Sequence, residues 1–368
     1  MLKEFSHNIF LISFFTILTS FLSVYLIIPR IRWVIVNLGL HDHPDERSSH
    51  KTCVPTLAGI SFFITLIIIT FFIQNFDTDK IGLNLLAAVT LVFVVGLKDD
   101  LVTSSPRSRL VMEILAILFL LFSSHMQVVT FDGFLHLYEL PKAFSYPGVI
   151  LLLLSIINGY NFIDGLDGLA SIIAIVIFSI FALIFFDTTN YFYFLICLSF
   201  IGMLGAYLIY NFSNSSKIFM GDTGSLIIGF CIGFCSLKYL AMDIPRSSFF
   251  YFNVENELLV LVGILWMPLF DLVRVIGVRL LNGKNPFYPD RNHLHHILVD
   301  CGLPHYKIAL LFGVLNSIII VLVLSLSYLF NYIQMIGVLV FISVALLSVF
   351  HKLKLRNQLG LIEFESGK

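Results

Sequence analysis

Long apolar segments separated by short polar ones recur along the whole chain. Most of them are long enough to cross about 30 Å of hydrocarbon as a helix. None shows the alternation of apolar and polar residues that is typical of a membrane β-strand. The pattern therefore predicts about eleven transmembrane helices, over residues 8–29, 56–75, 81–97, 109–128, 147–160, 168–186, 190–211, 218–240, 257–281, 306–328 and 331–351.

Composition supports this interpretation. The 368 residues are 58% hydrophobic and only 12% charged, with a mean hydropathy of +0.95, whereas soluble domains carry about 25% charged residues. We therefore expect an all-α, polytopic integral membrane protein. The first apolar segment is too long for a signal-peptide core and is predicted to remain as a helix. No repeat interrupts the chain, so residues 1–368 are predicted to form one domain, with 352–368 as a tail.

Basic residues gather on alternate connections between the apolar segments. Roughly 17 Lys and Arg lie on one set and roughly 5 on the other, and cytoplasmic loops carry the excess of positive charge. We therefore expect the N-terminus outside and the richer set in the cytoplasm. That set consists of residues 30–55, 98–108, 158–167, 212–217, 282–305 and 352–368.

Six aspartates lie within or at the ends of the apolar segments. Each costs about 2.5–3.5 kcal/mol at the bilayer centre, so all six facing lipid would cost on the order of 15–20 kcal/mol. They must face a water-filled cleft or a compensating cation. This reasoning leaves a metal site and an ion pathway open for Asp99, Asp100, Asp164, Asp167, Asp222 and Asp271.

The segment NGYNFIDGLDG places four of its polar side chains three residues apart: Asn158, Asn161, Asp164 and Asp167. In a continuing helix they would share one side, unless the glycine after each aspartate breaks it. Carboxylates with little basic charge nearby suit a hard cation such as Mg²⁺. The alternative is a turn in which Asp and Asn satisfy backbone amides. We favour the functional interpretation because the Asp-Gly pair is doubled.

Two further acidic motifs flank apolar segments. In FMGDTGS, Asp222 is either an N-cap or a metal ligand, and the glycine-containing turn would present free amides to phosphate oxygens. In GLKDD, the adjacent Asp99 and Asp100 cannot share a helix face, so at least one is expected past the helix end. Glu113 follows Arg109 by four residues, which favours a local ion pair over a catalytic role.

Two polar loops, the first at residues 41–59 and the second at residues 282–305, supply candidate anion donors. The spacing H-x-H-H in the second loop differs from zinc motifs, and Mg²⁺ has little affinity for imidazole. Donation to phosphate is therefore the better chemistry, with arginine as a forked donor. The first loop either binds lipid headgroups or only sets topology. The donors are Arg47, His50 and Lys51 in the first loop, and Arg291, His293, His295 and His296 in the second.

Together these motifs indicate an acidic, metal-suited centre with anion donors around it, at the cytoplasmic face of an intramembrane cleft. Phosphoryl transfer between a soluble nucleotide compound and a lipid phosphate fits this arrangement best. A cation-coupled transporter is the remote alternative. It should show internal repeats, broken helices and charges at mid-membrane depth.

The chain resembles the polyprenyl-phosphate N-acetylhexosamine-1-phosphate transferase family, which includes the WecA, TagO and MraY types. The resemblance spans nearly the whole chain and rests on five motifs in family order: HDHPDERSSHKTCVPTLAGI, GLKDDLVTSSPRSRL, NGYNFIDGLDGLA, KIFMGDTGSL and DRNHLHHIL. It implies that a polyprenyl phosphate attacks the β-phosphate of a UDP-N-acetyl sugar. The products are a polyprenyl-diphosphate sugar and UMP, and the reaction depends on Mg²⁺, with Mn²⁺ as a substitute.

The resemblance also implies residue roles. Asp222 would ligate Mg²⁺, and Asp99 and Asp100 would help bind metal and organise the lipid phosphate. The histidines at 293–296 would contact the nucleotide sugar. The nucleotide and metal site would be lined by Asn158, Asn161, Asp164 and Asp167. Thr103 stands where some members have a third acidic residue, and we give it no role. A phosphate monoester is largely dianionic at pH 7, so no strong base is required.

The DRNHLHH segment is closer to the WecA and TagO side of the family than to the MraY side. This favours UDP-GlcNAc, or a modified N-acetyl sugar, for a lipid-linked surface polysaccharide of O-antigen or teichoic type. The alternative is the phospho-MurNAc-pentapeptide transferase of peptidoglycan synthesis. We expect a bacterial inner-membrane location, UDP-sugar and undecaprenyl phosphate as substrates, and no nucleic-acid partner; a homodimer is left open.

Overall fold

The computed structural model describes residues 2–38, 41–42, 54–102, 105–123, 126–128, 130, 133–138, 141–245, 247–283 and 293–359. Two strands of two residues each, β1 (His41–Asp42) and β2 (Val54–Pro55), pair antiparallel. The α-helices are α1 (Leu2–Leu38), α2 (Gly59–Phe72), α3 (Gly82–Leu101), α4 (Pro106–Leu121), α5 (Lys142–Ile163), α6 (Leu169–Asp187), α7 (Tyr191–Asn211), α8 (Gly221–Leu240), α9 (Glu257–Ile264), α10 (Trp266–Leu281), α11 (Leu294–Asp300), α12 (His305–Ser327) and α13 (Tyr332–Gln358). Single 3₁₀ turns occupy Gln74–Phe76, Phe134–His136 and Val254–Asn256.

The prediction of a helical, multi-pass membrane protein is confirmed. Within the described ranges, eight helices are long and apolar enough to cross a membrane, or nine if the bent pair α9 and α10 forms one span. The predicted spans at 56–75 and 109–128 coincide with the shorter helices α2 and α4, of 14 and 16 residues. The count of eleven spans and their orientation therefore stay predictions.

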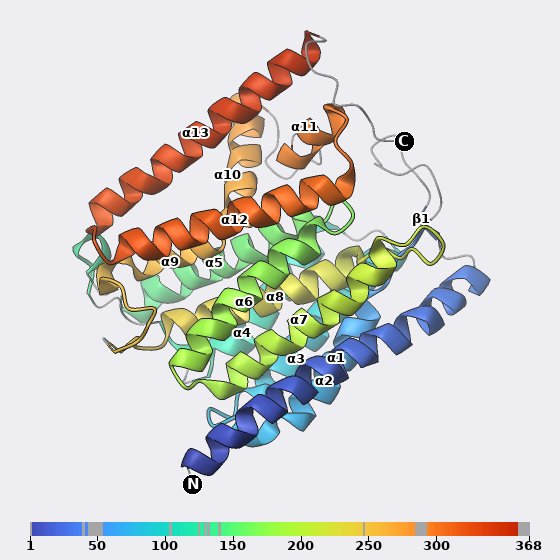
Figure 1. Ribbon diagram of the computed structural model, residues 1–368, viewed down its shortest axis with the longest axis horizontal. Coiled ribbons are helices and arrows are strands. Elements are labelled where there is room, and N and C mark those ends of the chain that lie inside the picture. The colour runs from blue at the N-terminus through green and yellow to red at the C-terminus, as the bar shows by residue number, and fades with distance from the viewer. Residues whose placement is uncertain are drawn as a thin grey trace.

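Burial divides the bundle into a centre and two edges. In Figure 1, α1 and α13 lie on opposite edges, with α6, α7 and α8 between them. The central helix α8 has 94% of its apolar window buried, against 22% for α1 and 17% for α13. Apolar residues on the two edge helices therefore face outward, which suits contact with lipid.

The segment expected as one span at 257–281 is broken, because α9 and α10 meet at an angle of 77°. Pro268, in the first turn of α10, has no N–H to donate to the preceding turn. Asn316 of α12 compensates at the break: its side-chain oxygen accepts from the Met267 N–H at 3.2 Å, and its nitrogen lies 3.5 Å from the Ile264 carbonyl oxygen. A neighbouring helix thus satisfies backbone groups that the break would leave unpaired.

Candidate active site

A pocket of about 380 Å³ opens where the C-terminal end of α3, the end of α5 and the start of α8 meet the region of α11 and α12. Four of the six aspartates singled out from the sequence line it. Asp99 is half-buried and is not among the lining residues, and Asp271 lies outside it. The polar side chains that line the pocket include Asp100, Asn161, Asp164, Asp167, Asp222, Ser225, His296 and His305.

Asp100 holds the first turn of α8. Its two carboxylate oxygens accept from the N–H groups of Asp222 at 2.7 Å and Thr223 at 2.9 Å, and the Thr223 hydroxyl donates to it as well. A Cβ added at Gly96 would lie 2.6 Å from the Thr223 Cα, so the glycine allows α3 to approach this closely. The carboxylate thus caps the positive end of α8.

This geometry corrects two predictions from the sequence. Asp99 and Asp100 both belong to the last turn of α3, so neither lies past the helix end. The N-terminal amides of Asp222 and Thr223 are bonded to Asp100 instead of being free for a phosphate group. Asp222 is not the N-cap of its own helix, because Met220 precedes the first turn in that position.

The Asp222 carboxylate turns toward α5. Its Oδ1 accepts from the Asn161 side-chain nitrogen at 2.7 Å and lies 3.4 Å from an Arg109 guanidinium nitrogen. The Asn161 nitrogen also donates to the Ser225 hydroxyl at 2.7 Å. One asparagine therefore fixes the carboxylate of Asp222, and the prediction that the two motifs converge is confirmed.

A buried network supports this contact from behind. Arg109 Nε donates to Glu113 Oε1 at 2.9 Å, as the four-residue spacing predicted, and Glu113 is fully buried. Asn158 donates to the other Glu113 oxygen at 2.7 Å, and its own oxygen lies 3.3 Å from Arg109. Asn158 thus orients Arg109 without lining the pocket itself.

The DGLDG segment is a connection and not a helical stripe. α5 ends at Ile163, Asp164 is its C-cap, and Gly168 begins the approach to α6 with a φ of +75°. Glycine adopts this left-handed conformation without steric cost. Asn158 and Asn161 therefore lie on a helix and the two aspartates do not, so the single stripe is not formed and the break that the sequence left open is found.

The two aspartates of this turn have opposite surroundings. Asp167 Oδ2 accepts from Lys217 Nζ at 2.7 Å and His305 Nδ1 at 2.9 Å. Burial alone would raise the pKa of Asp167, but the hydrogen bonds from these two partners outweigh it and lower that pKa. Asp164 has no hydrogen-bond donor or cation among the described side chains. Burial, and then the nearby charges of Asp222, Asp100 and Asp167, raise the pKa of Asp164 to about 7.

The sixth aspartate, Asp271, is buried in α10, and of the two predicted alternatives, a water-filled cleft or a compensating cation, the structure shows the cation. Its carboxylate accepts from His293 Nδ1 at 2.7 Å and from the Leu294 N–H at 3.1 Å, and Arg274 lies 3.3 Å away. These contacts attach the start of α11 to α10. Asp271 is therefore a positioning residue for the histidine cluster.

The three histidines of the H-x-H-H segment point in different directions. His296 lines the pocket, whereas His293 binds Asp271. His295 is 3% exposed and packs against Gly165, and its Nε2 has no hydrogen-bond partner among the residues that the structure describes. Burial, and then the neighbouring His296, lower the pKa of His295 to about 3, so this ring is neutral at pH 7.

Four predicted site residues, Arg47, His50, Lys51 and Arg291, lie outside the described residues. Sequence reasoning missed three others. His305 stands alone in GLPHYK, Lys217 was counted only as a topological charge, and Ser225 lies one turn beyond Asp222. The three-residue spacing from Asp222 could have indicated Ser225, but no spacing motif connects His305 and Lys217 to Asp167, which is 138 and 50 residues away in the chain.

The donor set fits a hard divalent cation only in part. Within the described ranges, no three His, Cys, Asp or Glu side chains could together hold a metal ion. Mg²⁺, however, is commonly bound by one or two carboxylates together with water and substrate phosphates. Asp164 and Asp222 could serve as these two carboxylates. No cation among the described side chains pairs with Asp164, and the nearest one to Asp222 is the Arg109 nitrogen at 3.4 Å.

Comparisons with known proteins agree with this chemistry. The sequence model of Glycosyl transferase family 4 matches residues 82–240. The probable undecaprenyl-phosphate N-acetylglucosaminyl 1-phosphate transferase of Bacillus subtilis is 27% identical over 289 residues, covering 78% of this chain and 77% of that protein. Undecaprenyl-phosphate alpha-N-acetylglucosaminyl 1-phosphate transferases are 26% identical in Salmonella typhi (78% and 76% covered) and 24% in Escherichia coli K12 (78% and 77% covered).

Proposed function

We propose that the chain is a polyprenyl-phosphate N-acetylhexosamine-1-phosphate transferase of glycosyl transferase family 4, and that it transfers GlcNAc-1-phosphate from UDP-GlcNAc to undecaprenyl phosphate. UMP is released, and the product begins a lipid-linked surface polysaccharide. The choice of sugar rests on the names of the relatives and on the DRNHLHH segment. The observation that carries the chemistry is the convergence of four aspartates on one pocket.

Asp222 and Asp164 are the residues that we propose to hold Mg²⁺, or Mn²⁺ in its place. When bound, the ion would neutralise negative charge on the diphosphate during transfer. Asn161 fixes one oxygen of Asp222, which leaves the other oxygen for a ligand. The surplus of negative charge that raises the pKa of Asp164 supports a site for a divalent cation.

Asp100 has a different proposed role. Both of its oxygens are engaged by the first turn of α8, so it positions Asp222 through the backbone. Asp99, half-buried in the preceding position, is assigned to organising the lipid phosphate. Its action as a base is not needed, because a phosphate monoester with a second pKa near 6 is already largely dianionic at neutral pH.

The bond changes are those of a simple displacement. An oxygen of the lipid phosphate forms a bond to the phosphorus that bears the sugar, and the bond from that phosphorus to the bridging oxygen breaks. UMP leaves with the bond electrons. His296 and His305 line the pocket and are proposed to contact the nucleotide sugar. Arg291 and the loop residues Arg47, His50 and Lys51 are proposed as further anion donors.

The bundle end that carries the pocket is proposed to face the cytoplasm of a bacterial cell, where UDP-sugars occur. The connections predicted to be cytoplasmic, which include residues 98–108, 158–167 and 212–217, carry the excess of Lys and Arg, and this supports that orientation. Attaching a cysteine-reactive, membrane-impermeant label at Ser215, between α7 and α8, tests it in intact cells. Protection of a Ser215→Cys variant until the cells are opened is the expected result, and labelling of intact cells would contradict the orientation.

The reaction is tested with purified protein, undecaprenyl phosphate, Mg²⁺ and a set of UDP-sugars, with UMP release as the measurement. We expect turnover with UDP-GlcNAc to exceed that with UDP-GalNAc and UDP-MurNAc-pentapeptide. A preference for UDP-MurNAc-pentapeptide would instead assign the protein to peptidoglycan synthesis. No UMP from any N-acetyl sugar nucleotide, combined with ion flux in proteoliposomes, would favour the transporter alternative.

A further inference from the structure

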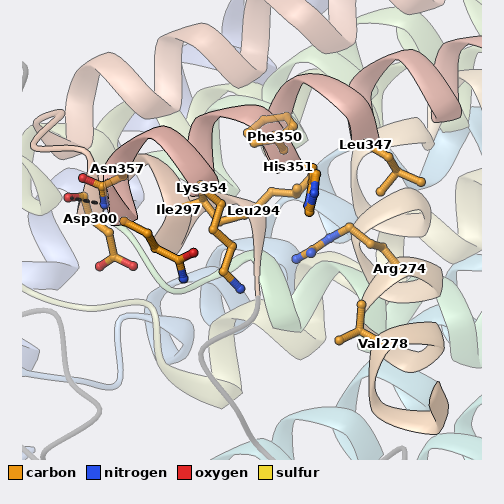
Figure 2. Close-up of a pocket in the computed structure, with 11 residues that line it drawn as sticks. Arg274, Val278, Leu294, Ile297, Asp300, Leu347, Phe350, His351, Lys354 and Asn357 are labelled. Atoms are coloured by element: carbon orange, nitrogen blue, oxygen red, sulfur yellow. Dashed lines mark hydrogen bonds between the residues drawn. The ribbon is translucent and has the colours of Figure 1, made fainter. Parts of the chain in front are cut away.

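A second pocket, of about 440 Å³, lies between α10, α11 and α13 (Figure 2). It shares no lining residue with the active-site pocket. Arg274 and Val278 come from α10, while α11 contributes Leu294, Ile297 and Asp300. The remaining walls come from the last turns of α13: Leu347, Phe350, His351, Lys354, Asn357 and Gln358.

Positive groups from two helices converge in this pocket. Figure 2 shows the head groups of Arg274 and Lys354 directed into the same space, with His351 above them. Asp300 lies at the other end, where its backbone carbonyl accepts from the Asn357 side chain at 3.1 Å. Two permanent cations and a histidine therefore line the pocket together with the carboxylate of Asp300, and Arg274 is also paired with Asp271 behind it. Arginine and lysine together are the usual donors to a phosphate group.

The apolar surroundings continue from the pocket along α13. Leu347 and Phe350 form part of the wall, and the outward face of the helix before them carries the exposed residues Val340, Phe341 and Val344. At the pocket the helix becomes basic, with the sequence HKLKLRNQ at its end. An apolar helix face that ends in basic residues is typical of the level at which lipid headgroups lie.

We propose that this pocket binds the phosphate headgroup of an anionic membrane lipid, with the headgroup between Arg274 and Lys354 and the acyl chain along α13. The lipid bridges α10 and α13 and so holds α11 between them. Arg274 also pairs with Asp271, which in turn binds His293. The pocket therefore lies next to the support of the histidine cluster without belonging to the active site, and its occupation does not depend on the sugar that is transferred.

The test compares lipids and variants on the full chain by native mass spectrometry and thermal unfolding in detergent. We expect phosphatidylglycerol to bind about tenfold more tightly than phosphatidylcholine and to raise the unfolding temperature. The double variant Lys354→Gln/His351→Asn should lose this preference while retaining UMP release. Lys352→Gln, an exposed change on the same helix that does not line the pocket, is the matched control and should keep the preference.

Three further arms identify the source of the phosphate. Undecaprenyl phosphate that displaces phosphatidylglycerol from the unchanged chain, but not from the double variant, would support the site and make the substrate lipid its occupant. Failure to displace it would make a phospholipid the occupant. Complete displacement by inorganic phosphate at the same concentration would overturn the proposal of a lipid. Equal binding by the double variant and the Lys352→Gln control would overturn the site.

Discussion

The two ends of α8 treat negative charge in opposite ways. At its C-terminal end, the carboxylate of Asp79 accepts from Lys238 at 2.8 Å and from the Tyr193 hydroxyl at 2.9 Å, and the ammonium group lies over the Tyr193 ring. At its N-terminal end, three carboxylates converge: Asp100, Asp164 and Asp222. The cation that the described residues place beside them is Arg109, 3.4 Å from Asp222 and shared with Glu113.

The difference separates a structural ion pair from a binding site. A balanced pair within a bundle satisfies its own charges and needs no ligand. A surplus of carboxylates in a partly buried pocket is costly unless protons or a cation reduce it. The same helix therefore has one end where the charges are paired and one end where we propose that a bound cation compensates the excess of carboxylates. Each prediction below tests that division.

The largest expected effect is on turnover when Asp222 loses its charge. Asp222→Asn keeps the size of the side chain and its neighbours Asn161 and Ser225, so the fold should be retained. Loss of a ligand that stabilises transition-state charge should lower kcat on the order of 10³-fold. UMP release by purified protein measures it. Retention of more than about a tenth of the activity would contradict the role of Asp222, provided that the unfolding temperature is unchanged.

The opposite result is expected at the other end of α8. Asp79→Asn leaves Lys238 without its carboxylate in a site where its side chain is 10% exposed. Breaking a buried pair in this way should cost about 3 kcal/mol of stability. The unfolding temperature should fall clearly, while UMP release per folded molecule should stay within about twofold of that of the unchanged protein. Loss of activity without loss of stability would contradict the division between the two ends.

A smaller effect is expected on the pH dependence of Mg²⁺ binding. The pKa of Asp164 is raised to about 7, so below that pH a proton occupies the carboxylate and competes with the ion. Mg²⁺ affinity should therefore fall by up to tenfold for each pH unit below about 7 and level off above it. Isothermal titration calorimetry with Mg²⁺ measures the slope, which Asp164→Asn should flatten.

Asp167→Asn is the matched control for that experiment. The pKa of Asp167 is lowered by its hydrogen bonds with His305 and Lys217, which outweigh burial, so it is ionised across the same pH range. The slope should therefore survive in this variant. A slope that disappears with Asp167→Asn and persists with Asp164→Asn would reverse the assignment of the two carboxylates.

The sequence predicts which aspartates line the pocket better than how they are held there. Local spacing was enough to find Asp164, Asp167 and Asp222 and the pair of Arg109 with Glu113. It could not show that Asp100 caps a helix whose first turn is 122 residues further on.

The errors have the same physical origin. A continuing helical stripe, one of the two alternatives for NGYNFIDGLDG, is not found because α5 ends at Ile163 and Gly168 leads into a new helix with a positive φ. The break between α9 and α10 depends on Asn316 of another helix. Periodicity reports which face of an element is apolar, whereas caps, kinks and cross-chain hydrogen bonds depend on partners that are distant in sequence.

His305 provides the smallest and most discriminating test. Its Nδ1 donates to Asp167 at 2.9 Å and the side chain lines the pocket, but Lys217 donates to the same oxygen at 2.7 Å. Because the lysine remains, His305→Gln removes about one hydrogen bond's contribution, worth roughly 1 kcal/mol. The KM for the UDP-sugar should rise about fivefold with little change in kcat. Steady-state kinetics of UMP release measures KM and kcat separately, with His351→Gln as a control that does not line the active-site pocket.

The kinetic split decides where His305 belongs. A rise in KM alone would place it with Asp167 on the balanced side of the pocket, where charges are paired and the substrate is only held. A hundredfold fall in kcat at constant KM would instead give it a part in proton transfer. The pocket would then have a reactive group among its paired residues, and charge balance would no longer distinguish the residues that position the substrate from those that act on it.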